Sequence, residues 1–193
     1  FRKKGVEALY LVDVADEFVL GSVGTYKEKQ LTSADQASPE DLKDLGEHSK
    51  DKEDDGEKEK EADDVEGFET LVERFKEVLG AQVADVKKSE RLVDSPACLV
   101  GAEGVSGHMD RMIRLMNKDA TLPKKTLELN PRHSLMRNLL GVIKKDRNDP
   151  FVSCACEQIF EGAMLVDGYL NDPHQLVERM HEIMTEAAGL KGA

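Results

Sequence analysis

Three cysteines, Cys98, Cys154 and Cys156, are the residues whose type could form disulfides, bind a metal or act as nucleophiles. Cys154 and Cys156 stand two residues apart in a stretch whose apolar spacing predicts a helix, so their side chains point to different faces and make a poor chelate. Three cysteines also do not form a disulfide framework. This pattern is typical of small apolar residues in a reducing compartment.

Other residues that could do chemistry stand alone. His174 and His181 lie seven apart with no third metal ligand nearby in the sequence. Ser95 beside Cys98 offers a nucleophile, but nothing marks a histidine as its base. The motifs GxxxxGK[ST], GxGxxG after a strand and HExxH are missing from the sequence. We therefore predict no catalytic centre and no metal site, and keep a Cys or Ser hydrolase only as a control hypothesis.

The net charge of −12 argues against nucleic acid and anionic membrane surfaces as partners. No apolar run approaches the roughly 20 residues that span a bilayer. Residues 47–64 hold ten acidic and four basic side chains and no aromatic or β-branched residue. Such a composition predicts a solvated linker, which is also the most natural domain boundary.

Residues 105–116 (VSGHMDRMIRLM) predict a helix that is unusually rich in methionine. Its apolar residues are Met109, Met112, Ile113, Leu115 and Met116. Methionine is flexible and polarisable and is over-used on promiscuous binding surfaces. The stripe can be part of an ordinary core, or it can form an exposed apolar face on a mobile helix. The pattern leaves both open.

Two consecutive amphipathic helices are predicted between Asp149 and Ala188. Each begins with an Asp-Pro pair, at positions 149–150 and 172–173, in which Asp can cap the free amides and Pro fits the first turn. The first stripe is Val152, Cys156, Ile159, Phe160, Ala163, Met164 and Leu170, and the second is Leu176, Val177, Met180, Ile183, Met184 and Ala187. The short turn between them predicts an antiparallel hairpin. Its remaining apolar surface is covered either by earlier residues of the chain or by a second copy.

The segments before this hairpin predict a small α+β domain. A helix is expected from Phe68 to Leu79, strands over 83–88, 97–100 and 125–129, and a helix over 134–145. The fold class is therefore α+β, with a small three-stranded sheet, helices packed on it and a helical end.

Residues 1–45 predict a piece of an alternating α/β unit. We expect a buried strand over 6–12, a helix over 14–23 capped by Asp13, and a short edge strand over 26–31. The expected inward residues of this helix are Val14, Phe18, Val19 and Val23. Because the chain begins with Phe rather than Met and an apolar strand follows, we expect a fragment of a longer protein.

Several stretches together resemble one known family. They are residues 1–7 (FRKKGVE) with Asp16-Glu17, Leu79-Gly80, residues 83–86 (VADV), 91–97 (RLVDSPA), 127–131 (LELNP) with His133, and 170–173 (LNDP). In this order and spacing they are similar to the heat-shock protein 90 chaperones, most closely the bacterial HtpG type, over nearly the whole chain. The resemblance implies the end of a middle domain (1–45), a charged flexible linker (46–64) and a C-terminal dimerisation domain (65–193).

The resemblance also implies a mixed sheet and a homodimer held by a four-helix bundle of the last two helices of each protomer. The implied interface residues are Ile159, Phe160, Ala163, Met164, Leu176, Val177, Met180, Ile183 and Met184. The Met-rich helix would project into the cleft between protomers and contact non-native client proteins through Met109, Met112, Ile113, Leu115 and Met116. The alternative is a purely structural oligomerisation module with this helix in its core.

In this family ATP and Mg²⁺ bind to the N-terminal domain, so we expect no ATP hydrolysis and no cofactor in this fragment. The expected partners are a second copy of the chain and client proteins, without nucleic acid or membrane. The sequence ends without the Glu-Glu-Val-Asp tail of cytosolic eukaryotic members and without an endoplasmic-reticulum retention tail. This favours a bacterial cytoplasmic member, or alternatively an organellar one.

Overall fold

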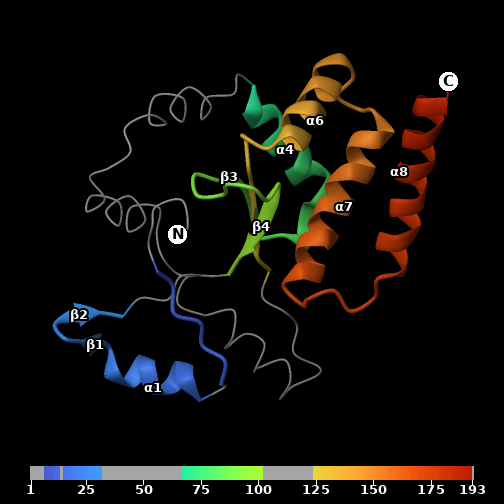
Figure 1. Ribbon diagram of the computed structural model, residues 1–193. Helices are drawn as coiled ribbons and strands as arrows, with labels where there is room; N and C mark the ends of the chain where they lie inside the picture. The colour runs from blue at the N-terminus through green and yellow to red at the C-terminus, as the bar shows by residue number, and fades with distance from the viewer. Residues whose placement is uncertain (1–6, 14, 32–66, 102–123, 193) are drawn as a thin grey trace. The chain divides into compact units, whose positions relative to one another are not determined.

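The computed structural model describes residues 7–13, 15–31, 67–101 and 124–192 (Figure 1). They fall into two compact units, one with the described residues up to 31 and one with those from 67 onward. The predicted linker over 46–64 lies outside the described residues. So does the Met-rich helix with Met109, Met112, Ile113, Leu115 and Met116, so these stay predictions.

The first unit contains helix α1 (Asp16–Val23) and a hairpin of strands β1 (Thr25–Tyr26) and β2 (Lys29–Gln30). Ala15, rather than the expected Asp13, is the N-cap of α1, and the Asp13 carboxylate accepts a hydrogen bond from the backbone N–H of Ala15 at 2.8 Å in the turn before the helix. In place of the single edge strand expected over 26–31, the structure has the antiparallel pair of β1 and β2. Its turn residues Lys27 and Glu28 have φ angles of 48° and 64°, as a two-residue hairpin turn requires.

Two predictions for this unit are wrong. Residues 7–12 form no strand, and their apolar side chains are exposed, with 81% of Leu9 and 93% of Val12 open to solvent. An apolar run becomes a buried strand only when other strands pair with it. Phe18, Val19 and Val23 of α1 were expected to point inward, but about half of each side chain is exposed.

The second unit is built on the predicted three-stranded sheet. Its strands β3 (Asp85–Lys88), β4 (Ala97–Val100) and β5 (Thr126–Leu129) lie in the order β3-β5-β4. Strand β5 runs parallel to β3 and antiparallel to β4, so the sheet is mixed. Val86, Leu127 and Leu129 are fully buried, whereas the residues between them are only partly covered or exposed. One face of the sheet therefore carries the core.

Helices pack on this face and on one another. They are α4 (Phe68–Leu79), α6 (Ser134–Lys145), α7 (Pro150–Val166) and α8 (His174–Gly192), and a short 3₁₀ turn (Gly80–Gln82) follows α4. Helix α4 packs on β3 and α7 packs on β4, while α4, α6 and α7 contact one another. Helix α8 packs along α7, on the side away from the sheet (Figure 1). The predicted α+β fold is confirmed.

Asn130 holds the connection between β3 and β4 in place. It is fully buried, and its side-chain amide donates hydrogen bonds to the carbonyl oxygens of Val93 (3.1 Å) and Ser95 (2.9 Å). Its own oxygen accepts from the backbone N–H of Arg132 at 3.0 Å. The stretches 91–97 and 127–131 thus meet in space, although about thirty residues separate them in the sequence.

Candidate self-association site on the terminal helix pair

Helix α7 is the platform of the candidate site. The Asp149 carboxylate accepts a hydrogen bond from the backbone N–H of Phe151 at 2.9 Å, and Pro150 occupies the first turn, so the predicted start is confirmed. Val152, Cys156 and Phe160 are buried and belong to the core of the second unit. One side of α7 is therefore fixed to the domain.

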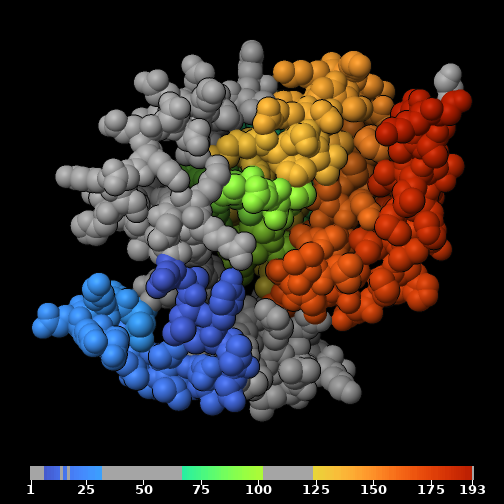
Figure 2. Space-filling view, viewed as in Figure 1, coloured from blue at the N-terminus to red at the C-terminus, as the bar shows by residue number. Residues whose placement is uncertain are grey.

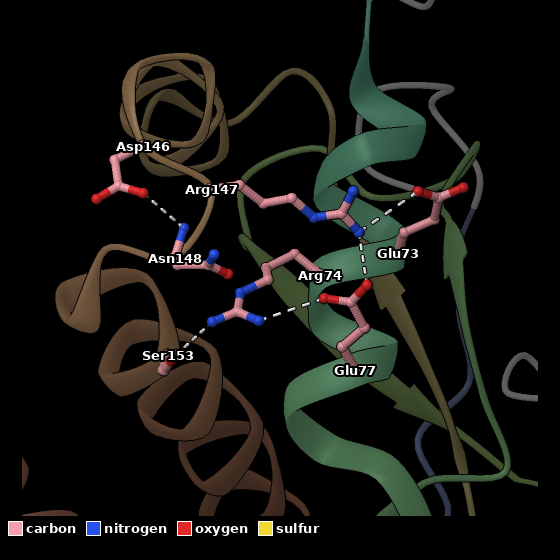
Figure 3. Close-up of polar contacts among 7 residues, drawn as sticks. All are labelled: Glu73, Arg74, Glu77, Asp146, Arg147, Asn148 and Ser153. Carbon is pink, nitrogen blue, oxygen red and sulfur yellow. Dashed lines mark hydrogen bonds and ion pairs between the residues drawn. The ribbon is translucent and has the colours of Figure 1, made fainter.

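Salt bridges and hydrogen bonds join α7 to α4 (Figure 3). The Arg74 guanidinium donates to Ser153 Oγ at 2.8 Å and to Glu77 at 3.3 Å. Arg147, in the connection before α7, pairs with Glu77 at 2.5 Å and with Glu73 at 3.8 Å. These contacts surround the first turn of α7 and fix where the terminal pair leaves the domain.

A tight turn reverses the chain between α7 and α8. Gly168 has a φ of 73°, a conformation that glycine adopts without strain. The Asp172 carboxylate accepts from the backbone N–H of His174 at 3.0 Å and so caps α8 as predicted. It also lies 2.5 Å from Nδ1 of the His174 ring. These hydrogen bonds lower the pKa of Asp172, and the Asp172 carboxylate raises the pKa of His174.

Helix α8 leaves one apolar face open. Among its described residues Leu176 alone is buried, and α8 packs on α7. Val177, Met180 and Met184 are 39%, 40% and 61% exposed. Their spacing of three and four residues places them on one side of the helix. We call these three residues the α8 stripe. In Figure 2, α8 forms a continuous band along the edge of the molecule beside α7.

The nine residues of the predicted interface do not share one environment. Phe160 and Leu176 are buried within the chain. Ile159, Ala163 and Met164 pack partly against the core, and Ile183 is half-buried. Only Val177, Met180 and Met184 are exposed. The α8 stripe is therefore the part of the predicted interface that is open to a partner.

Arg179, Glu157 and Glu161 form an ionic cluster between α7 and α8 that was not predicted from the sequence. The Arg179 side chain is 14% exposed, and its Nη1 lies 3.2 Å from Glu157 of α7. Its Nη2 pairs with Glu161, whose side chain is 16% exposed. The only available signal was the spacing of two glutamates four apart on α7 and an arginine within the apolar pattern of α8.

Cys98, Cys154 and Cys156 are free thiols in the structure. Burial raises the pKa of Cys156 to about 12 and also raises the pKa of Cys98 and of Cys154. Thiols of this kind are poorly nucleophilic. The ring of His133 accepts a hydrogen bond from the backbone N–H of Leu135 at 3.2 Å and so caps α6.

Within the described ranges, no group of three or more His, Cys, Asp and Glu side chains could hold a metal ion. The helices among the described residues are all too short or too polar to cross a bilayer.

Comparison with known proteins identifies the family. The family model described as "Hsp90 protein" matches residues 1–193. The chain is 44% identical to Chaperone protein HtpG of Oleidesulfovibrio alaskensis, over 98% of this chain and 29% of that protein. It is 40% identical to Chaperone protein HtpG of Nitratidesulfovibrio vulgaris, over 97% of this chain and 29% of the relative. The same-named protein of Chlorobium phaeovibrioides is 37% identical over 98% of this chain and 29% of its own length. The chain thus spans less than a third of these relatives, and it belongs to the Hsp90 protein family.

Proposed function

We propose that this chain is the C-terminal homodimerisation segment of an ATP-dependent molecular chaperone of the HtpG type, working in the bacterial cytoplasm. The family membership supports the chaperone assignment. The observation that carries the dimer is the α8 stripe, in which Val177, Met180 and Met184 stay exposed on a helix that packs on its own chain through one side. A second copy would bury this stripe against its own and complete a four-helix bundle.

The charges of α8 define how two copies meet. Glu178, Glu182 and Glu186 recur every four residues and form an acidic line on a different side of α8 from the stripe. Two such lines facing each other would repel, since like charges disfavour a close approach. The favoured arrangement therefore places the apolar stripes at the two-fold axis and the acidic lines in solvent.

Dimerisation would serve the longer protein by raising the effective concentration of its other domains for each other. We place the ATP- and Mg²⁺-dependent chemistry in those other domains. The relatives support that division, because this chain matches only 29% of their length and leaves room for such domains in the longer protein.

A charge placed on the stripe tests the dimer. Met180→Glu and Met184→Glu should each shift the chain toward the monomer in light scattering at micromolar concentration, because a carboxylate in an apolar interface loses its hydration. Thr185→Glu is the matched control, since Thr185 is exposed on the same helix but lies off the stripe. A dimer that persists in both methionine variants and in the control alike would contradict the assignment.

The second part of the proposal concerns client binding by the Met-rich helix at 105–116. Its support is the sequence pattern, with three methionines, one isoleucine and one leucine within eight residues. Replacing Met109, Met112 and Met116 by serine should lower binding of a hydrophobic dye and of an unfolded client while the chain stays folded. If the same change unfolds the chain, the helix is part of the core and the alternative of a purely structural module holds.

A further inference from the structure

Arg179 and the α8 stripe lie on opposite sides of the seam between α7 and α8. Consecutive residues of a helix are turned by about 100°. On a helical projection centred on Leu176, the buried residue of α8, Arg179 therefore falls on one flank and Met180 on the other. Arg179 reaches α7 through Glu157 and Glu161, while Met180 is 40% exposed.

The apolar contact of α8 with α7 does not by itself fix how α8 is turned about its axis. Helix α8 has one buried apolar residue, Leu176, and one half-buried residue, Ile183, which helical spacing places on nearly the same side. The neighbouring stripe, with Met180 at its centre, offers α7 a second apolar surface of similar size. Because the hydrophobic effect is non-directional, a turn of α8 that buries Met180 and exposes Ile183 would cost little in apolar area.

The ionic cluster distinguishes these two orientations. A turn that brings Met180 onto α7 carries Arg179 away from it and breaks the pairs with Glu157 and Glu161. The Glu161 side chain is only 16% exposed, so its carboxylate would be left poorly hydrated and without its cation. Breaking a buried ion pair in this way is strongly unfavourable, even where the pair itself adds little net stability. The Arg179 pairs thus favour the orientation that leaves the stripe outside.

We propose that Arg179 is a positioning residue for self-association, because its pairs with Glu157 and Glu161 hold α8 in the orientation that presents Val177, Met180 and Met184 to a second copy. This inference rests on the proposed dimer. In this proposal a polar cluster within each protomer determines which face of α8 is exposed to the second copy. A buried polar residue that selects the register of a coiled coil has a comparable role.

The test compares the full 193-residue chain with Arg179→Met. Met keeps the length and apolar volume of the stem but cannot form the ion pairs. We expect the dimer dissociation constant, measured by sedimentation, to rise at least tenfold. The same Arg→Met change at Arg137, which is exposed on α6, is the matched control and should leave the constant unchanged.

A second readout reports on orientation without the dimer. In dilute monomer, a cysteine placed at Ile183 should be alkylated faster in the Arg179→Met background, and one placed at Met180 slower, when labelling is resolved by mass spectrometry. A merely stabilising role for Arg179 would change both rates in the same direction. A charge swap, Arg179→Glu with Glu157→Arg and Glu161→Arg, should restore dimerisation to within about threefold.

The outcomes separate the two proposals. A wild-type chain that is monomeric at every concentration contradicts the proposed dimer. Three other outcomes overturn the role of Arg179 but leave the proposed dimer standing. They are an Arg179→Met dimer as tight as the wild-type dimer, an unchanged ratio of the two labelling rates, and a charge swap that fails to restore the dimer.

Discussion

The side-chain amide of Asn130 donates a hydrogen bond to the carbonyl oxygen of Ser95 across 2.9 Å, inside the second unit. Together with its bond to Val93, it ties the β3–β4 connection to the buried end of β5. Asn130→Ala would leave these carbonyl oxygens without their donor. We expect a loss of about 1–3 kcal/mol in the free energy of unfolding, measured in urea.

Asn138→Ala provides the control for this prediction. Asn138 is exposed on α6, where alanine is the better helix former, so its replacement should leave stability unchanged or slightly raised. Equal effects of the two substitutions would show that Asn130 does not hold the connection.

Replacement of two methionines of the second unit by alanine should affect different properties of the chain. Met136 is fully buried in α6, whereas Met184 is 61% exposed on α8. Met136→Ala should lower the free energy of unfolding by about 2–5 kcal/mol, because it leaves a cavity in the core. Met184→Ala should leave the unfolding of dilute monomer nearly unchanged and weaken the dimer. Urea unfolding at chain concentrations below the dimer dissociation constant measures the stability of the monomer, and sedimentation measures the dimer. A large loss of monomer stability in Met184→Ala would contradict the description of the α8 stripe as exposed.

The pair of Asp172 and His174 predicts a pH dependence at the start of α8. The pKa of Asp172 is lowered, so its contribution is present above the ordinary Asp range and is lost as the pH falls through its folded pKa. The pKa of His174 is raised, so its contribution is present below the ordinary His value of 6.5 and is lost as the pH rises through its folded pKa. The pair should hold best between the two ranges, at mildly acid pH.

An NMR titration of the His174 ring measures this coupling. Asp172→Asn removes the carboxylate charge and should shift the His174 midpoint to lower pH. A midpoint that does not move in this variant would show that the two side chains do not interact in solution.

Cys154 and Cys156 should differ in reactivity although they are close on α7. Cys156 is fully buried and its pKa is raised to about 12, so at pH 8 only about one thiol in ten thousand is ionised. Cys154 is only partly buried. Alkylation of the native chain at pH 8, followed by mass spectrometry, should therefore label Cys154 well before Cys156. Equal rates would contradict the placement of Cys156 in the core.

Much of the second unit could be predicted from local pattern. The amphipathic spacing in α4 and α6, the short apolar strands and the Asp149-Pro150 start of α7 each carry a signal within a few residues. The structure confirms these elements almost to the residue.

Features that depend on distant residues could not be predicted. The run over 7–12 has the composition of a buried strand, but strand formation requires partner strands that local pattern does not supply. The turn at Lys27-Glu28 carries no Gly, Asn or Asp signal for its positive φ angles. Phe160 and Val177 each belong to the apolar stripe of their own helix, so the sequence pattern does not distinguish them. In the structure Phe160 of α7 is buried in the core, whereas Val177 of α8 is 39% exposed. Arg179 could be paired with Glu157 only once the hairpin was folded.

Sedimentation equilibrium of the unmodified chain across a concentration series shows whether the chain forms the proposed dimer. We expect a species of twice 21.4 kDa that persists on dilution into the low micromolar range, because two copies bury the α8 stripe against each other. A single species of 21.4 kDa at every concentration would contradict it, and the terminal helix pair would then belong to the fold of one chain alone.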